Sequence, residues 1–150
     1  MRKFEIVSAP YLNYIGKIDL PTRSDKGSAG YDFYSPVDFT VQPGETVIIP
    51  TDIKAYMEQD EVLLLFVRSS IGIKKNIVLA NGTGVIDSTY YGNPNNDGNI
   101  CGAFTNIGKE PQSFKQGDRI MQGVFMKYLT TADDKPINQQ RLGGIGSSGK

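Results

Sequence analysis

Histidine is absent from the 150-residue chain, and cysteine occurs once, at Cys101. Without histidine the chain cannot build a Ser-His-Asp triad, a Cys-His pair or a His-liganded zinc site. A single cysteine cannot form an internal disulfide or hold an iron–sulfur cluster, and it favours a reducing, cytoplasmic location. Acid–base chemistry near neutral pH is therefore left to Asp, Glu, Lys and Tyr.

The chain also lacks net charge and long apolar runs. Its 16 basic and 16 acidic residues cancel, which argues against nonspecific binding to nucleic acid or to an acidic membrane surface. No apolar run approaches the roughly 20 residues that span a bilayer, and the start MRKFEIVSAP has no long apolar core of a secretory signal. We expect one domain over residues 1–150, with no membrane or nucleic-acid partner.

β-Branched residues dominate what is present. Ile, Val and Thr number 33, against 14 for Ala and Leu, and stiff β-branched side chains favour strands. Short strands at this spacing are typical of an all-β sandwich or barrel. The predicted strands are Lys3–Val7, Gly30–Ser35, Asp38–Val41, Glu45–Pro50, Ile53–Met57, Glu61–Val67, Ile77–Leu79, Thr83–Ile86, Asn99–Thr105, Gln112–Phe114 and Asp118–Tyr128.

One short helix is predicted over Ser69–Lys74, with Ser69 or Ser70 as its N-terminal cap. Two segments are predicted to be mobile. Asn93–Asn99 (NPNNDGN) consists of turn formers, and the polar arm Thr130–Lys150 offers little apolar surface to bury.

Five short segments of the sequence, called patches here, contain residues that could bind phosphate or take part in catalysis, although each segment alone also has an ordinary structural interpretation. Arg68 at a helix start can bind an anion, the Asn81-Gly82 pair predicts a hairpin, and a Gly/Ser tail can wrap phosphates with backbone N–H groups. The tail lacks the spacing of a Walker loop. In chain order the patches are AGYD (Ala29–Asp32), RSS (Arg68–Ser70), GVIDSTYYG (Gly84–Gly92), GDRIMQ (Gly117–Gln122) and RLGGIGSSG (Arg141–Gly149).

Taken in this order, the patches resemble the homotrimeric dUTP pyrophosphatase (dUTPase) family from about residue 6 to residue 150. The resemblance implies a jelly-roll-like β fold with one short helix and a flexible C-terminal tail. It also implies three active sites, each shared between subunits. The implied reaction is hydrolysis of dUTP to dUMP and pyrophosphate by attack of water on the α-phosphorus, which limits uracil in DNA and supplies dUMP.

The resemblance assigns roles residue by residue. Asp87 matches the carboxylate that orients and deprotonates the water. Tyr90 matches the ring that packs against the deoxyribose and leaves no room for a 2′-hydroxyl. Asn81, Gly84 and Ile86 lie in the expected hairpin that pairs with the polar edge of uracil.

Further residues match the phosphate and metal contacts of the family. Asp32 matches a carboxylate that reaches Mg²⁺ through water, while the triphosphate supplies most of the metal's ligands. The tail is expected to close over the β- and γ-phosphates. The phosphate-contacting matches are Arg68, Ser69, Ser70 and Gln122, and the tail matches are Arg141, Gly144, Ile145, Gly146, Ser147 and Ser148.

Three departures from the family pattern suggest a divergent bacterial or phage branch. Thr89 stands where a second acid is usual, and Ile145 stands where an aromatic residue usually stacks on uracil. The third departure is an insertion at Asn93–Asn99, which is expected to shape the rim of the site or a partner surface.

Two alternatives share the fold. A dCTP deaminase would need a Glu as proton shuttle three residues before Asn106, where this chain has Ala103. A regulatory protein that binds a repressor partner stays open, although the intact Asp87 argues that catalysis is kept.

Overall fold

Within residues 1–137, which the computed structural model describes, strands form at all eleven predicted places. Two strands, β7 and β10, have the predicted bounds, and the ends of the others differ by at most two residues, because strand ends depend on the partner strand as well as on local pattern. The strands are β1 (Lys3–Ile6), β2 (Tyr31–Tyr34), β3 (Phe39–Val41), β4 (Thr46–Pro50), β5 (Ile53–Tyr56), β6 (Glu61–Phe66), β7 (Ile77–Leu79), β8 (Gly84–Asp87), β9 (Cys101–Asn106), β10 (Gln112–Phe114) and β11 (Arg119–Lys127).

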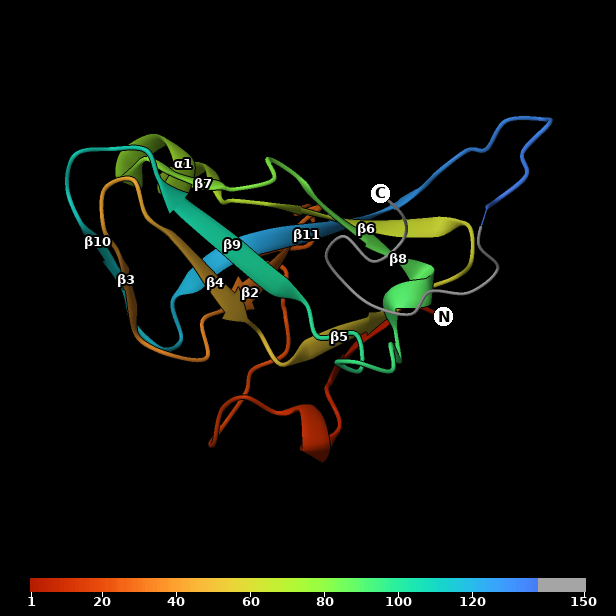
Figure 1. Cartoon of the computed structure of the whole chain (residues 1–150), viewed down its shortest axis with the longest axis horizontal. Coiled ribbons are helices and arrows are strands. Elements are labelled where there is room, and N and C mark those ends of the chain that lie inside the picture. The colour runs from red at the N-terminus through yellow and green to blue at the C-terminus, as the bar shows by residue number, and fades with distance from the viewer. Residues whose placement is uncertain (138–150) are drawn as a thin grey trace.

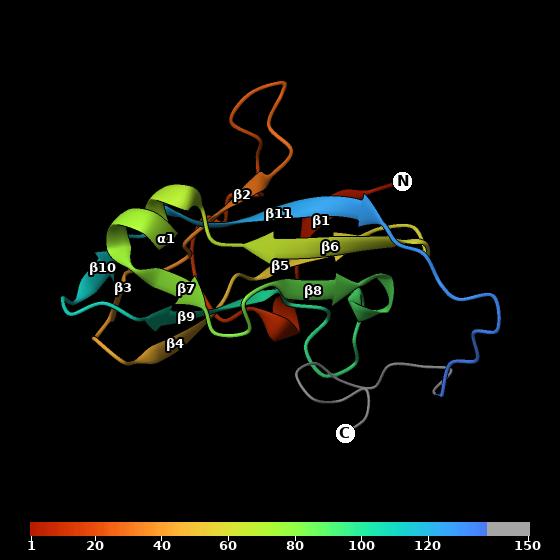
Figure 2. The same cartoon turned by 90° about the horizontal axis from the view of Figure 1, so that it is seen from above.

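The strands assemble into a jelly-roll-like sandwich. One sheet has the order β2-β11-β6-β8 and the other has the order β4-β9-β7, and all the pairs in both are antiparallel. Figure 2 shows β11, β6 and β8 running above β9 and β4. Two smaller pairs, β1-β5 and β3-β10, complete the strand pairing.

The core lies between the two sheets. Leu63 and Phe33 from the four-stranded sheet and Phe104 from the three-stranded sheet are each at most 1% exposed and belong to one apolar cluster. The alternating burial of β9, in which every second residue is inward, is the pattern expected of a strand with one face on the core. Burial of this cluster is the main stabilising contribution to the fold.

The helix α1 spans Ser69–Lys75 and lies at one end of the sandwich, beside β7 (Figure 1). The predicted serine cap is wrong. Arg68 holds the N-cap position and makes no side-chain cap bond, so Ser69 and Ser70 are exposed residues of the first turn. The helix ends at Asn76 in the left-handed conformation (φ 54°), after Lys74 and Lys75, whose charges suit a helix C-terminus.

The Asn81-Gly82 pair makes a turn, but the predicted hairpin is wrong. Gly82 adopts φ 75°, and its N–H donates to the carbonyl of Leu79 at 2.9 Å. The strands on either side then separate, because β7 pairs with β9 whereas β8 pairs with β6. The turn therefore connects the two sheets at their edges, and the space between β7 and β8 is open rather than closed by a strand ladder.

The segment Asn93–Asn99, called the insertion turn below, was predicted to be mobile, and this expectation is wrong. Its backbone folds into successive turns, and Asn93, Asp97 and Asn99 are buried. Polar turn formers can be held inside a protein when each has hydrogen-bond partners, which composition alone does not reveal.

Two short 3₁₀ helices were not predicted, η1 at Ala9–Tyr11 and η2 at Ser88–Tyr90. Residues 130–137 form neither helix nor strand and are exposed, as expected of the arm, and the rest of the arm lies outside the described residues. In the described part of the chain, no helix combines the length and the apolar character that crossing a membrane requires.

Candidate active site

A cavity of about 540 Å³ opens beside β8, at the place where the two sheets separate. We call it the Asp87 pocket. Its wall includes all five residues that the sequence assigned to the base, the sugar and the catalytic water. They are Asn81, Gly84, Ile86, Asp87 and Tyr90.

Gly84 is required by close packing of the pocket wall. A Cβ at this position would lie 2.8 and 2.9 Å from the Cβ and Cδ1 of Leu65, which faces it across the β6-β8 pairing. The absence of a side chain lets β8 pair with β6 beside the Leu65 side chain, which a larger residue would displace.

The spacing of Asp87 and Tyr90 places both on one side of the pocket. Asp87 ends β8 and occupies the N-cap position of η2, whose last residue is Tyr90. Residues three apart align along a 3₁₀ helix because it has three residues per turn. A carboxylate and a phenol ring therefore face the same cavity from one short, rigid segment.

Cys101 also lines the pocket but does not supply a nucleophile. Burial, together with the charge of Asp52, raises the pKa of its thiol. A thiol that stays protonated at neutral pH is a poor nucleophile. A carboxylate that positions a water molecule is the chemistry better suited to this cavity.

A second set of predicted residues meets on β2, β11 and the end of β6, and we call it the Asp32 group. Gln122 on β11 lies opposite Asp32 on one side and Phe66 on the other. Arg68 Nε lies 3.2 Å from Asp32 Oδ1, and the Asp32 side chain is only 7% exposed. Gly30 makes room for Gln122, since a Cβ there would come within 2.3 Å of the amide oxygen.

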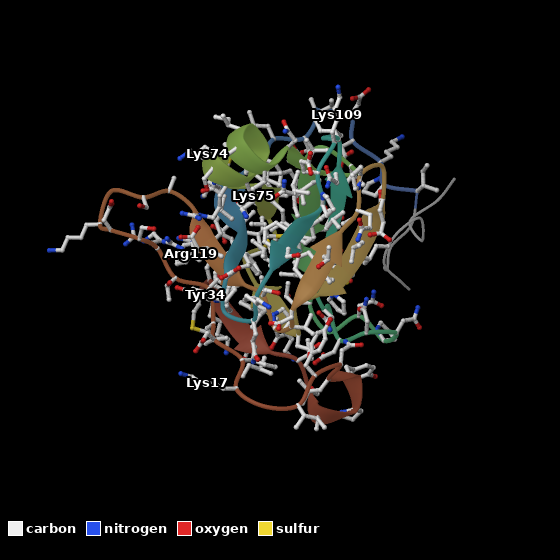
Figure 3. The ribbon with its side chains drawn as sticks, turned by 90° about the vertical axis from the view of Figure 1, so that its left-hand side faces the viewer. Lys17, Tyr34, Lys74, Lys75, Lys109 and Arg119 are labelled. Atoms are coloured by element: carbon white, nitrogen blue, oxygen red, sulfur yellow. The ribbon has the colours of Figure 1, made fainter. Side chains whose placement is uncertain are left out.

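Arg119 belongs to the Asp32 group, although sequence reasoning did not select it. Its Nη1 lies 3.6 Å from Asp32 Oδ2 and 3.4 Å from the Ser24 hydroxyl, which itself donates to Asp32 Oδ2 at 3.1 Å. Its place in the GDRI patch was the available signal. Figure 3 shows Arg119 on the same end of the molecule as Lys74 and Lys75 of α1, so positive side chains gather there.

The Asp87 pocket and the Asp32 group are separated within one chain. Asp87 pairs with Val62 of β6, while Asp32 is three strands away and level with Phe66. Three strand spacings across and four residues along amount to roughly 20 Å. A catalytic carboxylate and the residues that hold the reacting phosphate must lie much closer than this.

The predicted tail contacts cannot be placed. Arg141, Gly144, Ile145, Gly146, Ser147 and Ser148 lie outside the described residues. Phe104 and Phe114 do not replace the stacking aromatic, because both are buried in the core at 1% and 3% exposure. Among the described residues Tyr90 is the one aromatic side chain that lines the pocket.

The sequence model of the dUTPase family matches residues 16–149. The chain belongs to the dUTPase family. Among curated relatives, the deoxyuridine 5′-triphosphate nucleotidohydrolase of Lactococcus lactis subsp. lactis strain IL1403 is 42% identical over 150 residues, which cover 99% of this chain and 98% of that protein. The enzyme of the same name from Haemophilus influenzae strain PittEE is 37% identical over 138 residues, 87% of each chain.

Solved structures support the same family and its jelly-roll-like fold. The dUTPase of Streptococcus mutans is 40% identical, with a TM-score of 0.74 over 85% of this chain and 97% of that one. The dUTPase from phage phi11 of S. aureus has a TM-score of 0.72 over 92% of this chain and 97% of that one. It is 21% identical, and its likeness concerns the fold.

Proposed function

We propose that the Asp87 pocket and the Asp32 group form one catalytic site across the boundary between two subunits. The chain is a dUTPase, and its reaction is dUTP plus water to dUMP and pyrophosphate. The observation that carries the proposal is the separation of roughly 20 Å within one chain. A second copy of the chain can bring the two halves together around one nucleotide.

In this site Asp87 is the general base. Its carboxylate, at the rigid end of β8, holds a water molecule in line with the α-phosphorus and accepts a proton as the water attacks. The displaced group is pyrophosphate, so no covalent intermediate with the protein is needed. Thr89, in place of a second acid, is exposed and does not line the pocket, which leaves Asp87 as the base.

The pocket selects the nucleoside. The segment between Asn81 and Ile86 presents backbone groups and the Asn81 amide to the polar edge of uracil. Cytosine exchanges a donor and an acceptor at that edge, and buried mismatched groups are costly. The Tyr90 ring packs against the deoxyribose and excludes a 2′-hydroxyl.

The Asp32 group holds the phosphates. Arg68 supplies charge and directional N–H donors, and the exposed Ser69 and Ser70 hydroxyls add donors beside it. Gln122, fixed against Gly30, is a further donor. The tail from Arg141 to Ser148 then covers the β- and γ-phosphates and excludes water.

Mg²⁺ is proposed as the cofactor, and it neutralises charge on the triphosphate when bound. The residues fit an ion held chiefly by phosphate and water, because the described residues contain no group of three or more acidic, His or Cys ligands. Asp32 already faces Arg68 and Arg119, so its contact with the ion runs through water. Its direct effect in the chain is to hold those two guanidinium groups.

A homotrimer is the proposed assembly, in keeping with the resemblance to the homotrimeric family. Apolar side chains support association at the mouth of the pocket, where Ile48 and Val85 are 56% and 59% exposed. Large exposed apolar side chains that cluster in this way are typical of a contact surface.

The two alternatives gain no support from the described residues. Ala103 lines the pocket and cannot shuttle a proton as a dCTP deaminase requires. The insertion turn buries Asn93, Asp97 and Asn99 within its own chain and exposes Pro94 and Asn95, and no contact of these residues points to a regulatory partner.

Subunit complementation tests the shared site. Asp87→Asn and Arg68→Ala proteins should each have little activity, because each lacks one half of every site. Reassembly of an equal mixture should restore about a quarter of the wild-type sites, since random association gives that share of pairs with both halves intact. A mixture no more active than the two parents together would place both halves in one chain and overturn the proposal. Sedimentation of the same mixture gives the subunit number.

A further inference from the structure

The insertion turn reaches the Asp87 pocket through Asn96. The side chain of Asn96 lines the cavity, and its Nδ2 donates a hydrogen bond of 2.7 Å to the Tyr90 hydroxyl. The Tyr90 hydroxyl in turn donates to the backbone carbonyl of Asn99 at 2.8 Å. Two groups of the insertion turn thus hold the far end of the ring.

The Asn96 amide is oriented by a bond of its own. Its Oδ1 accepts a hydrogen bond of 3.0 Å from the backbone N–H of Gly98. Because the oxygen is engaged there, the NH₂ group faces Tyr90, and the opposite assignment of the amide would set two N–H groups of Gly98 and Asn96 against each other. Asn96 therefore acts on Tyr90 as a donor.

Gly98 also brings the insertion turn close to the main chain of Tyr90. It adopts φ 83°, and a Cβ there would lie 2.5 Å from the Tyr90 carbonyl oxygen. Only a glycine tolerates this conformation and this approach.

Buried polar contacts fix the insertion turn from the other side. Asp97 Oδ2 lies 2.8 Å from Lys54 Nζ and accepts bonds from the N–H and hydroxyl of Ser8 at 2.8 and 2.9 Å. Asn99 makes two hydrogen bonds with the fully buried Asp52. The Asn99 Oδ1 accepts from the backbone N–H of Asp52, and the Asn99 Nδ2 donates to Asp52 Oδ1. The turn is therefore a rigid support for whatever it contacts.

We propose that Asn96 is a positioning residue for sugar selection, acting through the Tyr90 hydroxyl. The proposal rests on the proposed function, in which the Tyr90 ring packs against the deoxyribose. A ring fixed at its base alone can tilt, and a tilt opens space beside the 2′ position. With its hydroxyl held by Asn96 and Asn99, the ring keeps the plane that fits a deoxyribose and excludes a ribose.

The insertion turn thereby holds the Tyr90 ring, a role that its composition of turn formers does not suggest. An alternative is that Asn96 contacts the nucleotide itself, since it lines the cavity. The two roles differ in one respect. A residue that acts only through Tyr90 has no effect once the Tyr90 hydroxyl is gone, whereas a direct contact keeps its effect.

The test is a double-mutant cycle of Asn96→Ala and Tyr90→Phe, with kcat and KM measured for dUTP and UTP. Each single variant should raise KM for dUTP and lower the dUTP/UTP ratio of kcat/KM by about threefold to tenfold, the effect of one lost hydrogen bond. The kcat for dUTP should change by less than about twofold, because Asp87 is untouched. The double variant should be no worse than Tyr90→Phe alone, because that substitution already removes the hydroxyl through which Asn96 acts.

Asn93→Ala is the matched control. Asn93 is buried in the same turn, and its Oδ1 accepts a hydrogen bond from the backbone N–H of Asn95. It should lower the melting temperature and leave the dUTP/UTP ratio unchanged. A purely structural role for Asn96 predicts the same pattern for Asn96→Ala, and this result would overturn the proposal. Independent effects that multiply in the double variant would also overturn it.

One further variant separates this inference from the proposed function. Tyr90→Leu removes the ring and should reduce the dUTP/UTP ratio more than any variant in the cycle. If Tyr90→Leu lowers the ratio and both Asn96→Ala and Tyr90→Phe do not, the role of Asn96 fails alone. If Tyr90→Leu leaves the ratio unchanged, the assignment of Tyr90 to the sugar fails, and the role of Asn96 fails with it.

Discussion

The Asp87 pocket is suited to bind a nucleoside, whereas the Asp32 group is suited to bind phosphates, and the two sites differ in the residues that line them. Apolar side chains, strand backbone and a single carboxylate line the pocket, and a glycine lets its wall pack closely. The Asp32 group gathers a buried carboxylate between two guanidinium groups, at the end of the molecule where Lys74 and Lys75 also lie (Figure 3). A flat base is selected by the shape of the cavity and by hydrogen bonds along one polar edge, whereas a triphosphate is selected by charge and by directed donors. Substitutions in the Asp87 pocket should therefore change kcat or the fit of the nucleoside, and substitutions in the Asp32 group should change the affinity for the phosphates.

The largest effect is expected from Asp87→Asn. Asparagine keeps the shape but cannot accept a proton, so kcat should fall by about 10²–10⁴-fold, or about 3–5 kcal/mol of barrier. Binding of a non-hydrolysable dUTP analogue should persist, and the melting temperature should hardly change. Near-normal turnover would end the assignment of Asp87 as the base.

Arg68→Ala, a substitution in the Asp32 group, should have the next largest effect on the reaction with dUTP. Loss of a charged donor costs about 1.5–3 kcal/mol, so kcat/KM for dUTP should fall by about 10- to 100-fold. Binding of deoxyuridine, which carries no phosphate, should be unaffected. Lys74→Ala, an exposed cation on the same helix, is the control and should stay within about twofold. Equal losses in both variants would mean that general positive charge, rather than the Arg68 contact, holds the phosphates.

Gly84→Ala tests the shape of the pocket wall. The added methyl group meets the buried Leu65 side chain at less than 3 Å, and overpacking of this kind costs about 1–3 kcal/mol of stability. Displacement of β8 should also raise KM for dUTP severalfold. Gly27→Ala, where the nearest atom to the new methyl group lies at 3.5 Å, should change neither quantity.

Asp97→Asn should have the smallest effect on turnover and a clear effect on stability against acid. Burial alone would raise the pKa of Asp97, but hydrogen bonds from Lys54 and Ser8 outweigh it and lower the pKa below 3.8. A carboxyl with a lowered pKa stabilises the fold fully above its ordinary value, and this contribution disappears as pH falls through the lower, folded value. Melting temperatures of the wild type should therefore drop below about pH 3.8 through this group.

The Asn variant should be less stable than the wild type at neutral pH, and the difference between the two should shrink as the acid limb is reached. A constant difference down to the lowest pH at which both fold would show that Asp97 contributes nothing through its charge. Catalysis by Asp97→Asn should stay close to that of the wild type wherever both proteins are folded.

Local patterns in the sequence were enough to predict the strands, the helix and the family. β-Branched runs between glycine and proline turns predicted all eleven strands, because side-chain shape and alternation act locally. The order of the five patches resembles the dUTPase family, and that resemblance led to Asp87, Tyr90, Arg68 and Gln122. Asn81 and Gly84, which the resemblance assigned to the base, line the same cavity as Asp87.

The tertiary structure alone decided which strands pair and what the polar turns do. The Asn81-Gly82 turn joins two sheets instead of closing a hairpin, because β6 and β9 compete for the neighbouring strands and bury more apolar surface. The insertion turn is held inside by Lys54, Ser8 and Asp52, partners more than 40 residues away. Local composition reports what a segment prefers when isolated. Which distant groups satisfy its polar atoms is decided only when the whole chain has folded.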